Sequence, residues 1–193
     1  MILPDFSRTV NRSDPFPNFR SQDVIDRELA DAMLDWLDEE APWKLRIADF
    51  YEQHEFSLSD RPGPGILGAF TSGPFVKAVG SELSRRFAAP SLALVDVTVH
   101  RLVEGQTIKV HNDEIGEEET HRLLLQVNRG WRAEQGGLLM LFAGDDSASL
   151  TDVVMPSHRS AFAFEISQQS YHAVSTVRTG ARDTIVYTFR KTG

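Results

Sequence analysis

The chain has 193 residues, of which 41% are hydrophobic, which is enough for one substantial core and too few for two comfortable domains. Its formal net charge is -8, and an acidic cluster formed by Glu114, Glu117, Glu118 and Glu119 would repel a polyanion, so no nucleic-acid partner is expected. Cysteine is absent, which excludes disulfides, thiolate ligands and iron-sulfur clusters.

The sequence carries no sign of a targeting or membrane segment. Its N-terminal residues lack the continuous apolar stretch of a signal peptide, and no run of about 18 apolar residues occurs in it. We therefore expect a cytoplasmic protein with no membrane partner. Nothing in the sequence indicates an oligomeric state.

The first forty residues predict an extended arm followed by an amphipathic helix. Residues 1–20 carry proline, asparagine and arginine, and their three phenylalanines, Phe6, Phe16 and Phe19, would hold the arm against the core. From Ser21, a candidate N-cap, apolar side chains recur at helical spacing until Pro42. The apolar stripe consists of Ile25, Leu29, Ala32, Met33 and Trp36.

The next segments predict a strand, a loop and a second helix. Residues 43–56 alternate loosely and predict a strand, whereas the proline and glycine residues of 57–68 predict a loop near which a substrate could lie. The second helix is expected over residues 74–87, with Ser72 as its N-cap.

After Pro90 the apolar pattern changes from helical to strand periodicity. Val95, Val97 and Val99 alternate with polar residues, and several short strands separated by turn residues follow. Helices followed by a run of strands favour an antiparallel β-sandwich or barrel backed by helices. We expect a mainly β protein with flanking helices, folded as one domain over residues 1–193. In it, residues 1–90 supply the arm, the helices and a supporting strand, and residues 91–193 form the core.

Three residues in the second half form a candidate metal site. In an extended strand His111 and Asp113 would point to the same face, and His172 begins another short apolar run. Two imidazoles and one carboxylate suit a non-haem Fe(II) that keeps positions open for other ligands. His158 is the main competitor for the third ligand position. It lies between Pro156 and the apolar run of residues 161–164, and we favour His172.

Arg182 and Thr184 follow His172 after an antiparallel return of about ten residues. Such a return would bring the guanidinium near a metal-bound ligand, where it could hold a remote carboxylate bidentately. The Thr184 hydroxyl, two residues later on the same face, would add a hydrogen bond.

With these residues in series, the chain resembles the 2-oxoglutarate and Fe(II)-dependent dioxygenases, and among them the prolyl 4-hydroxylase-like branch. The resemblance covers roughly residues 95 to 190. Its matching elements are the strand and turn of Val99–Gly105, the His111/Asp113 pair, Arg122, Val127–Trp131, Gly136–Phe142, Pro156–Phe164, Tyr171–Val174 and Arg182–Thr184.

The resemblance implies a fold, a set of cofactors and a division of roles among the residues. The fold would be the double-stranded β-helix, a cupin-like jelly roll with the metal in its open mouth. His111, Asp113 and His172 would be the catalytic metal ligands for Fe(II). Arg182 and Thr184 would bind the cosubstrate 2-oxoglutarate. O2 would be the oxidant, with ascorbate allowed as a reductant.

Two positions depart from the pattern of the family. Leu102 and Ile108 stand where many relatives carry tyrosines that contact the cosubstrate, and His100 or another polar group could replace that contact. Asp113 is present, whereas halogenating relatives carry a small residue there, so hydroxylation or another two-electron oxidation is expected and halogenation is not.

The resemblance implies hydroxylation of an unactivated C–H bond in an amino-acid-type small molecule, with release of succinate and CO2. A peptidyl, prolyl-type hydroxylase is the first alternative, and a non-catalytic jelly-roll module that binds a metal or ligand is the second. A small-molecule enzyme would have a closed pocket with an extra arginine or histidine, and a peptide enzyme an exposed groove. Candidate substrate contacts are His100, His121, Arg122 and Trp131, although Arg122 fits a structural salt bridge equally well and Trp131 is more typical of a packing residue.

Overall fold

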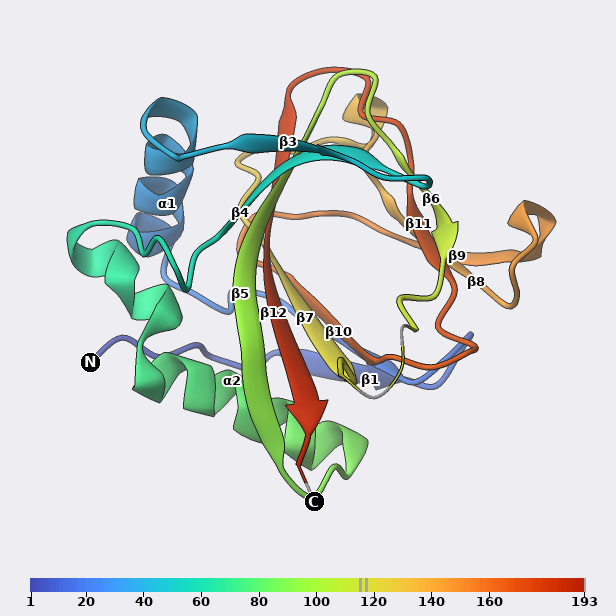
Figure 1. Ribbon diagram of the computed structural model, residues 1–193, viewed down its shortest axis with the longest axis horizontal. Coiled ribbons are helices and arrows are strands. Elements are labelled where there is room, and N and C mark those ends of the chain that lie inside the picture. The colour runs from blue at the N-terminus through green and yellow to red at the C-terminus, as the bar shows by residue number, and fades with distance from the viewer. Residues whose placement is uncertain (115, 117, 193) are drawn as a thin grey trace.

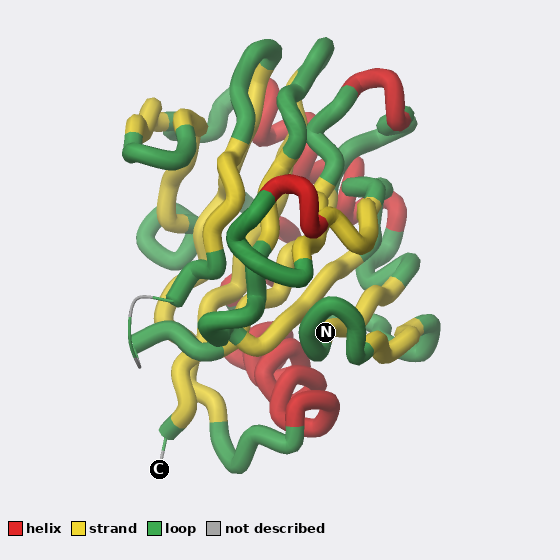
Figure 2. Tube along the Cα trace, turned by 90° about the vertical axis from the view of Figure 1, so that its right-hand side faces the viewer, coloured by secondary structure: helices red, strands yellow, loops and turns green. Residues whose placement is uncertain are grey.

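The structure is a computed structural model that describes residues 1–114, 116 and 118–192. Ile115 and Gly193 lie outside the described residues, as does Glu117 of the predicted acidic cluster. Two antiparallel sheets face each other, and two long helices cover the outer face of the larger sheet (Figure 1). In a view turned by 90°, the strands lie nearer the viewer than these helices (Figure 2). This arrangement confirms the predicted mainly β fold with flanking helices.

The larger sheet has eight strands in the order β1-β2-β10-β7-β12-β5-β4-β3, and the smaller sheet has four in the order β6-β11-β8-β9. The strands of the larger sheet are β1 (Thr9–Arg12), β2 (Asn18–Ser21), β3 (Lys44–Ile47), β4 (Glu52–Ser57), β5 (Leu92–Val103), β7 (His121–Gln126), β10 (Ala161–Glu165) and β12 (Ala181–Lys191). Those of the smaller sheet are β6 (Ile108–His111), β8 (Leu139–Phe142), β9 (Leu150–Val154) and β11 (His172–Val174).

The helices are α1 (Arg27–Glu39) and α2 (Gly73–Phe87), and the predicted amphipathic stripes account for both. Each buries its apolar stripe in one core against the outer face of the larger sheet. The predicted start of α1 at Ser21 was wrong, because Ser21 ends β2, where it pairs with Thr9 and Ala161. Ser72 does precede α2, but its hydroxyl donates to the carbonyl of Ala69 (2.8 Å) and does not cap the helix.

The N-terminal arm is part of the larger sheet. It forms β1 and β2, and β2 pairs with β10 near the other end of the sequence. Phe16 and Phe19 are buried, and the ring of Phe19 stacks on that of Phe87 with 5.7 Å between the centroids. The predicted role of the phenylalanines in holding the arm is therefore confirmed.

Alternation along β12 separates the helix side of the larger sheet from its inner side. Ile185 and Tyr187 belong to the core beneath the helices, whereas Thr184 and Val186 line a cavity between the sheets. A second apolar core between the two sheets includes Leu102, Leu141, Phe162, Phe164 and Val174. Polar side chains at inward positions of these strands therefore face one space between the sheets.

Two further predictions for the first half of the chain were wrong. Residues 43–56 form a hairpin of β3 and β4 and not one strand. The segment 57–68 does not line the cavity between the sheets, and its Leu58 and Leu67 are buried in the core beneath the helices. Among the described residues, no helix combines the length and the apolar character needed to cross a membrane.

Candidate active site

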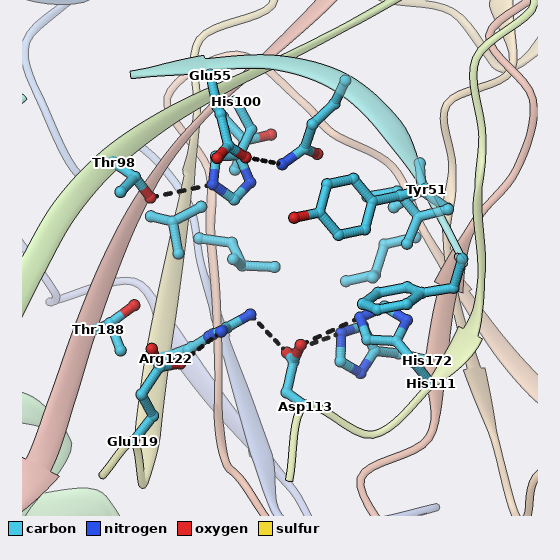
Figure 3. Close-up of a pocket in the computed structure, with 18 of the residues that line it drawn as sticks. Tyr51, Glu55, Thr98, His100, His111, Asp113, Glu119, Arg122, His172 and Thr188 are labelled. Atoms are coloured by element: carbon cyan, nitrogen blue, oxygen red, sulfur yellow. Dashed lines mark hydrogen bonds and ion pairs between the residues drawn. The ribbon is translucent and has the colours of Figure 1, made fainter. Parts of the chain in front are cut away.

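A cavity of about 620 Å³, here called the main cavity, opens between the two sheets. Its walls come from the β3–β4 hairpin, from β5, β7 and β12 of the larger sheet, and from β6, β8 and β11 of the smaller one. The three predicted metal ligands lie on one side of it and His100 on the other, with the Tyr51 hydroxyl pointing into the space between them (Figure 3).

His111, Asp113 and His172 meet because β6 pairs with β11 so that His111 lies opposite His172. One nitrogen from each ring and one carboxylate oxygen all lie within 4.8 Å of one another. Nε2 of His111 is 3.2 Å from Oδ1 of Asp113, and Nε2 of His172 is 3.3 Å from Oδ2. This donor set suits a divalent transition metal such as Fe(II).

The two imidazoles are oriented by hydrogen bonds from their other nitrogens. Nδ1 of His111 lies 2.8 Å from the carbonyl of Lys109, and Nδ1 of His172 lies 2.8 Å from the carbonyl of Ser170. A carbonyl can only accept, so each Nδ1 carries a hydrogen, and Nε2 is left as the ring nitrogen that can bind a metal. This is the tautomer that metal-binding histidines commonly adopt.

Asp113 reaches the site by a different route from the one predicted. β6 ends at His111, and Asp113 has a left-handed backbone with φ 62° that no strand would have. The preceding Asn112 accepts a hydrogen bond from the backbone N–H of Glu114 (3.1 Å), which forms a local turn. A turn, and not strand alternation, therefore directs the carboxylate toward the two histidines.

The Asp113 carboxylate is buried and ion-paired with Arg122, whose Nη1 lies 2.8 Å from Oδ2. Burial opposes its ionisation, but Arg122 and the two histidines outweigh burial and hold the pKa of Asp113 well below its usual range. Arg122 also pairs with Glu119 (2.6 Å). Of the two predicted roles of Arg122, the structural salt bridge is the one that the structure shows.

Arg182 and Thr184 lie in the wall of the same cavity as the three ligands. Nη1 of Arg182 donates to the Thr184 hydroxyl (2.9 Å), which in turn donates to Oε1 of Gln126 (2.9 Å). Burial lowers the pKa of Arg182 to about 10, so the guanidinium stays charged near neutral pH. Its Nε has no partner among the described residues, which leaves it a donor for an anion.

Gly137 gives Arg182 the room that its side chain occupies. It has φ 64°, and a Cβ there would lie 2.9 Å from Cδ of Arg182 and 3.3 Å from the Trp131 ring. The Trp131 indole donates to the carbonyl of Gly136 (2.9 Å). Trp131 does not line the main cavity, so its position fits a packing residue and not the substrate contact considered from the sequence.

The two other candidate substrate histidines lie on opposite faces of the larger sheet. His100 lines the main cavity, where its Nε2 lies 3.0 Å from the Thr98 hydroxyl. Burial, followed by the charge of Arg122, lowers the pKa of His100 to about 3, so the ring is neutral. His121 points toward Phe87 of α2, with 5.5 Å between the centroids, and does not line the main cavity. His121 is therefore not placed to contact a substrate there.

Sequence reasoning missed Tyr51 and Gln126 as parts of the site. Tyr51 forms a β-bridge with Ile108, so a tyrosine from the β3–β4 turn stands beside one of the two positions where the family pattern led us to expect a tyrosine. Tyr51, Gln53 and Glu55 all line the main cavity. Their alternate positions in the sequence could have indicated one strand face that points into the site. The turn between β3 and β4 had to be recognised first.

Comparison with known proteins identifies the type of site. The sequence model of the 2OG-Fe(II) oxygenase superfamily matches residues 97–189, which include both candidate histidine ligands, Asp113, Arg182 and Thr184. No curated protein sequence matches the chain significantly.

Solved structures with the same fold are prolyl hydroxylases and other oxygenases. A Pseudomonas putida prolyl-4-hydroxylase has a TM-score of 0.69 at 15% identity, covering 90% of this chain and 92% of its own. A Trichoplax adhaerens prolyl hydroxylase, solved with a hypoxia inducible factor peptide fragment, has a TM-score of 0.68 at 11% identity, covering 90% and 83%. A Burkholderia pseudomallei 2OG-Fe(II) oxygenase family protein has a TM-score of 0.64 at 16% identity, covering 96% and 86%.

The predicted double-stranded β-helix is thereby confirmed, since these structures share the arrangement of sheets and helices described above. The family match spans nearly all of the strands that form the site. Over residues 97–189, which carry the site, the chain matches the 2OG-Fe(II) oxygenase superfamily, and it is a dioxygenase that uses Fe(II), 2-oxoglutarate and O2.

Proposed function

We propose that His111, Asp113 and His172 hold the Fe(II), and that Arg182 with Thr184 binds the 5-carboxylate of 2-oxoglutarate. The observation that carries this proposal is the convergence of both groups in one cavity, with both Nε2 atoms directed at Asp113. The free Nε donor of the buried Arg182 fits a carboxylate partner. The donor set and the clamp together fit the cofactors of the family.

When bound, Fe(II) and 2-oxoglutarate supply the activation of O2 that inserts one oxygen into a C–H bond and releases succinate and CO2. The protein contributes geometry and a defined electrostatic environment. Arg122 keeps Asp113 ionised and in place, and the two backbone carbonyls fix the histidine tautomers. The apolar walls formed by Leu124, Leu139 and Val174 limit the access of water to the reacting atoms.

The substrate that we propose is an amino-acid-type small molecule. The volume of the main cavity falls within the range of about 300–1,000 Å³ usual for small-molecule sites. Arg46 and Glu55 both line it, with 3.4 Å between Nη1 and Oε1, so the wall offers one positive and one negative group. A zwitterion needs both, and neutral His100 adds a hydrogen-bonding ring nearby.

A peptidyl, prolyl-type hydroxylase is the second candidate. It is favoured by the solved structures of the same fold, which include a Pseudomonas putida prolyl-4-hydroxylase and the Trichoplax adhaerens prolyl hydroxylase with a bound peptide fragment. A residue within a peptide is also an amino-acid-type substrate, so both candidates use the same chemistry. They differ in whether free termini are recognised.

We also propose that residues 1–193 fold as one domain. The arm and the β3–β4 hairpin, which belong to the first 90 residues, pair with strands of residues 91–193 in one sheet. This pairing supports a single domain with no boundary between the two parts. A cytoplasmic location stays a prediction from the sequence.

A mass-spectrometric screen tests the substrate proposal. Free amino acids and short proline-containing peptides are incubated with the protein, and a gain of one oxygen that requires both Fe(II) and 2-oxoglutarate identifies a substrate. The small-molecule proposal expects free amino acids to gain oxygen and Arg46→Gln to raise their KM. Oxidation of peptides alone, with Arg46→Gln unchanged, would support the peptidyl candidate and contradict the first.

A further inference from the structure

A second cavity, of about 210 Å³, lies behind the cosubstrate clamp. It is bounded by β2 and β10 of the larger sheet and by β9 with the loop that follows it. Of the residues that the structure describes, only Leu139 and Arg182 line both this cavity and the main one. The second cavity is therefore a separate space that shares one wall with the proposed 2-oxoglutarate site.

The charged groups in the wall of the second cavity are both positive. Arg20 and Arg182 line it, and among the described residues no aspartate or glutamate does. Arg20 uses Nη2 to pair with Asp152 (2.5 Å), but its Nε is buried and has no partner within the described part of the chain. The Nε of Arg182 is in the same condition. A buried donor without an acceptor costs free energy, so an anion that accepted hydrogen bonds from these two Nε atoms would stabilise this wall.

A hydrogen-bonded chain separates the two cavities and adds a further donor on this side. Arg182 donates to Thr184, which lines only the main cavity, and Thr184 donates to Gln126, which lines only the second one. Oε1 of Gln126 also accepts from Asn128 (3.3 Å). Gln126 lines the second cavity, and its amide NH2 group donates to no described residue, so this group can serve as a donor there.

We propose that the second cavity is a binding site for a small carboxylate, held by Arg20 and Gln126 and sharing Arg182 with the cosubstrate. Its volume lies below the range of about 300–1,000 Å³ typical of drug-sized ligands, so a short-chain acid fits and a nucleotide does not. Leu139, Val154 and Phe162 supply apolar wall for a short carbon chain. Two arginines exclude a metal cation.

Binding at this site is coupled to the cosubstrate site through Arg182. Two carboxylates beside one guanidinium repel each other and compete for its free Nε donor, so each weakens the affinity of the other. Succinate, which the dioxygenase itself releases, belongs to the class of acids that fit. The second cavity thus gives succinate a way to weaken 2-oxoglutarate binding without occupying its site.

The test is a calorimetric titration of succinate into the full chain that has been saturated with Mn(II) and 2-oxoglutarate under anaerobic conditions. We expect one saturable succinate site, with weaker binding of acetate and none of chloride at matched ionic strength. Arg20→Gln removes a charged donor and weakens succinate by at least about tenfold. Arg85→Gln, on the far side of the larger sheet in α2, leaves the affinity unchanged.

Asp152→Asn should change succinate affinity in the opposite direction from Arg20→Gln, and it tests the proposal even if Arg20→Gln fails to fold. It releases Arg20 from its carboxylate partner while keeping the guanidinium, so succinate should bind more tightly. A merely structural role of the Arg20–Asp152 pair would weaken binding in both variants. The proposal is overturned if succinate shows no saturable binding, if Arg20→Gln binds it as well as the wild type, or if Asp152→Asn weakens it. Loading with Mn(II) and 2-oxoglutarate is followed separately, so failure of the proposed cosubstrate site would be seen as such.

Discussion

Arg122 holds the carboxylate of Asp113 by a contact of 2.8 Å between Nη1 and Oδ2, while Oδ1 faces Nε2 of His111. The pair joins β7 of the larger sheet to the turn that follows β6 of the smaller sheet. The larger sheet therefore holds Asp113 in place from across the cavity. One oxygen of the carboxylate is engaged by the guanidinium, and the other is left for a metal. Arg122 is thus a positioning residue for the metal site.

Arg122→Gln is expected to weaken metal binding by about tenfold, the lower end of the effect of removing a residue that orients a metal ligand. The physical reason is that Asp113 has a left-handed backbone and would no longer be held in its orientation. Calorimetry with Mn(II) in place of Fe(II) measures the effect. Glu119→Gln is the matched control, because it removes the other partner of Arg122 and leaves the contact with Asp113. Unchanged or tighter Mn(II) binding in Arg122→Gln would refute the positioning role.

His172→Ala should abolish metal binding, because it removes one of the three proposed protein donors. His158→Ala is the matched control: His158 was the competing third ligand in the sequence, but its Nε2 lies 3.1 Å from Asp31, away from the site. Mn(II) titration of both variants is the measurement. Retained binding in His172→Ala, or loss in His158→Ala, would mean that the ligand set is different.

Arg182→Ala should keep the metal but weaken 2-oxoglutarate by about 1.5–3 kcal/mol, the cost of a lost charge-assisted hydrogen-bonded pair. Affinity is measured by anaerobic titration of the metal-loaded protein. An Arg182→Ala variant that binds 2-oxoglutarate as the wild type does would exclude Arg182 as the clamp.

Gly137→Ala tests whether the position of the Arg182 side chain matters for binding of 2-oxoglutarate. The added Cβ would meet Cδ of Arg182 at 2.9 Å, so the guanidinium must move. We expect weaker 2-oxoglutarate binding with Mn(II) affinity unchanged. Gly144→Ala is a suitable control, because its Cβ would meet only the Ser149 hydroxyl, at 4.0 Å. Normal cosubstrate affinity in Gly137→Ala would show that Arg182 does not depend on this space.

Stability should fall in acid partly because of His121. Burial lowers its pKa from 6.5 to about 4, with Glu165 and Lys191 acting in opposite directions. The denatured chain therefore takes up a proton before the native protein does, and stability decreases as pH falls from about 6.5 toward 4.

Urea unfolding of the wild type and His121→Phe between pH 7 and pH 4 measures this contribution. The variant should lose less stability over that range, by on the order of 1 kcal/mol, because its aromatic ring does not titrate. His100 and His158 are present in both proteins and cancel in the comparison. Parallel pH profiles for the two proteins would show that His121 titrates normally in the native state.

The helices and the metal ligands could be predicted from the sequence because their signals are local or strongly patterned. The stripe from Leu29 to Trp36 identified α1, and His111, Asp113 and His172 had the spacing of a known site. Ser21 was wrongly predicted to be a helix N-cap because a serine at a helix start and one at a strand end have similar local sequences. Its strand partner in β10 lies far along the chain, so the sequence near Ser21 does not reveal the pairing. Tyr51 and Gln126 were missed for the same reason, since strand pairing, not sequence distance, brings Tyr51 to the main cavity and Gln126 to Thr184.

The central claim is that one cavity binds Fe(II) through the two histidines and Asp113 and binds 2-oxoglutarate through Arg182. The most direct test is the visible absorption spectrum of the anaerobic protein with Fe(II) and 2-oxoglutarate, followed by admission of O2. We predict a weak charge-transfer band that His172→Ala abolishes, and slow formation of succinate once O2 is present. A folded protein that shows neither band nor succinate would contradict the claim.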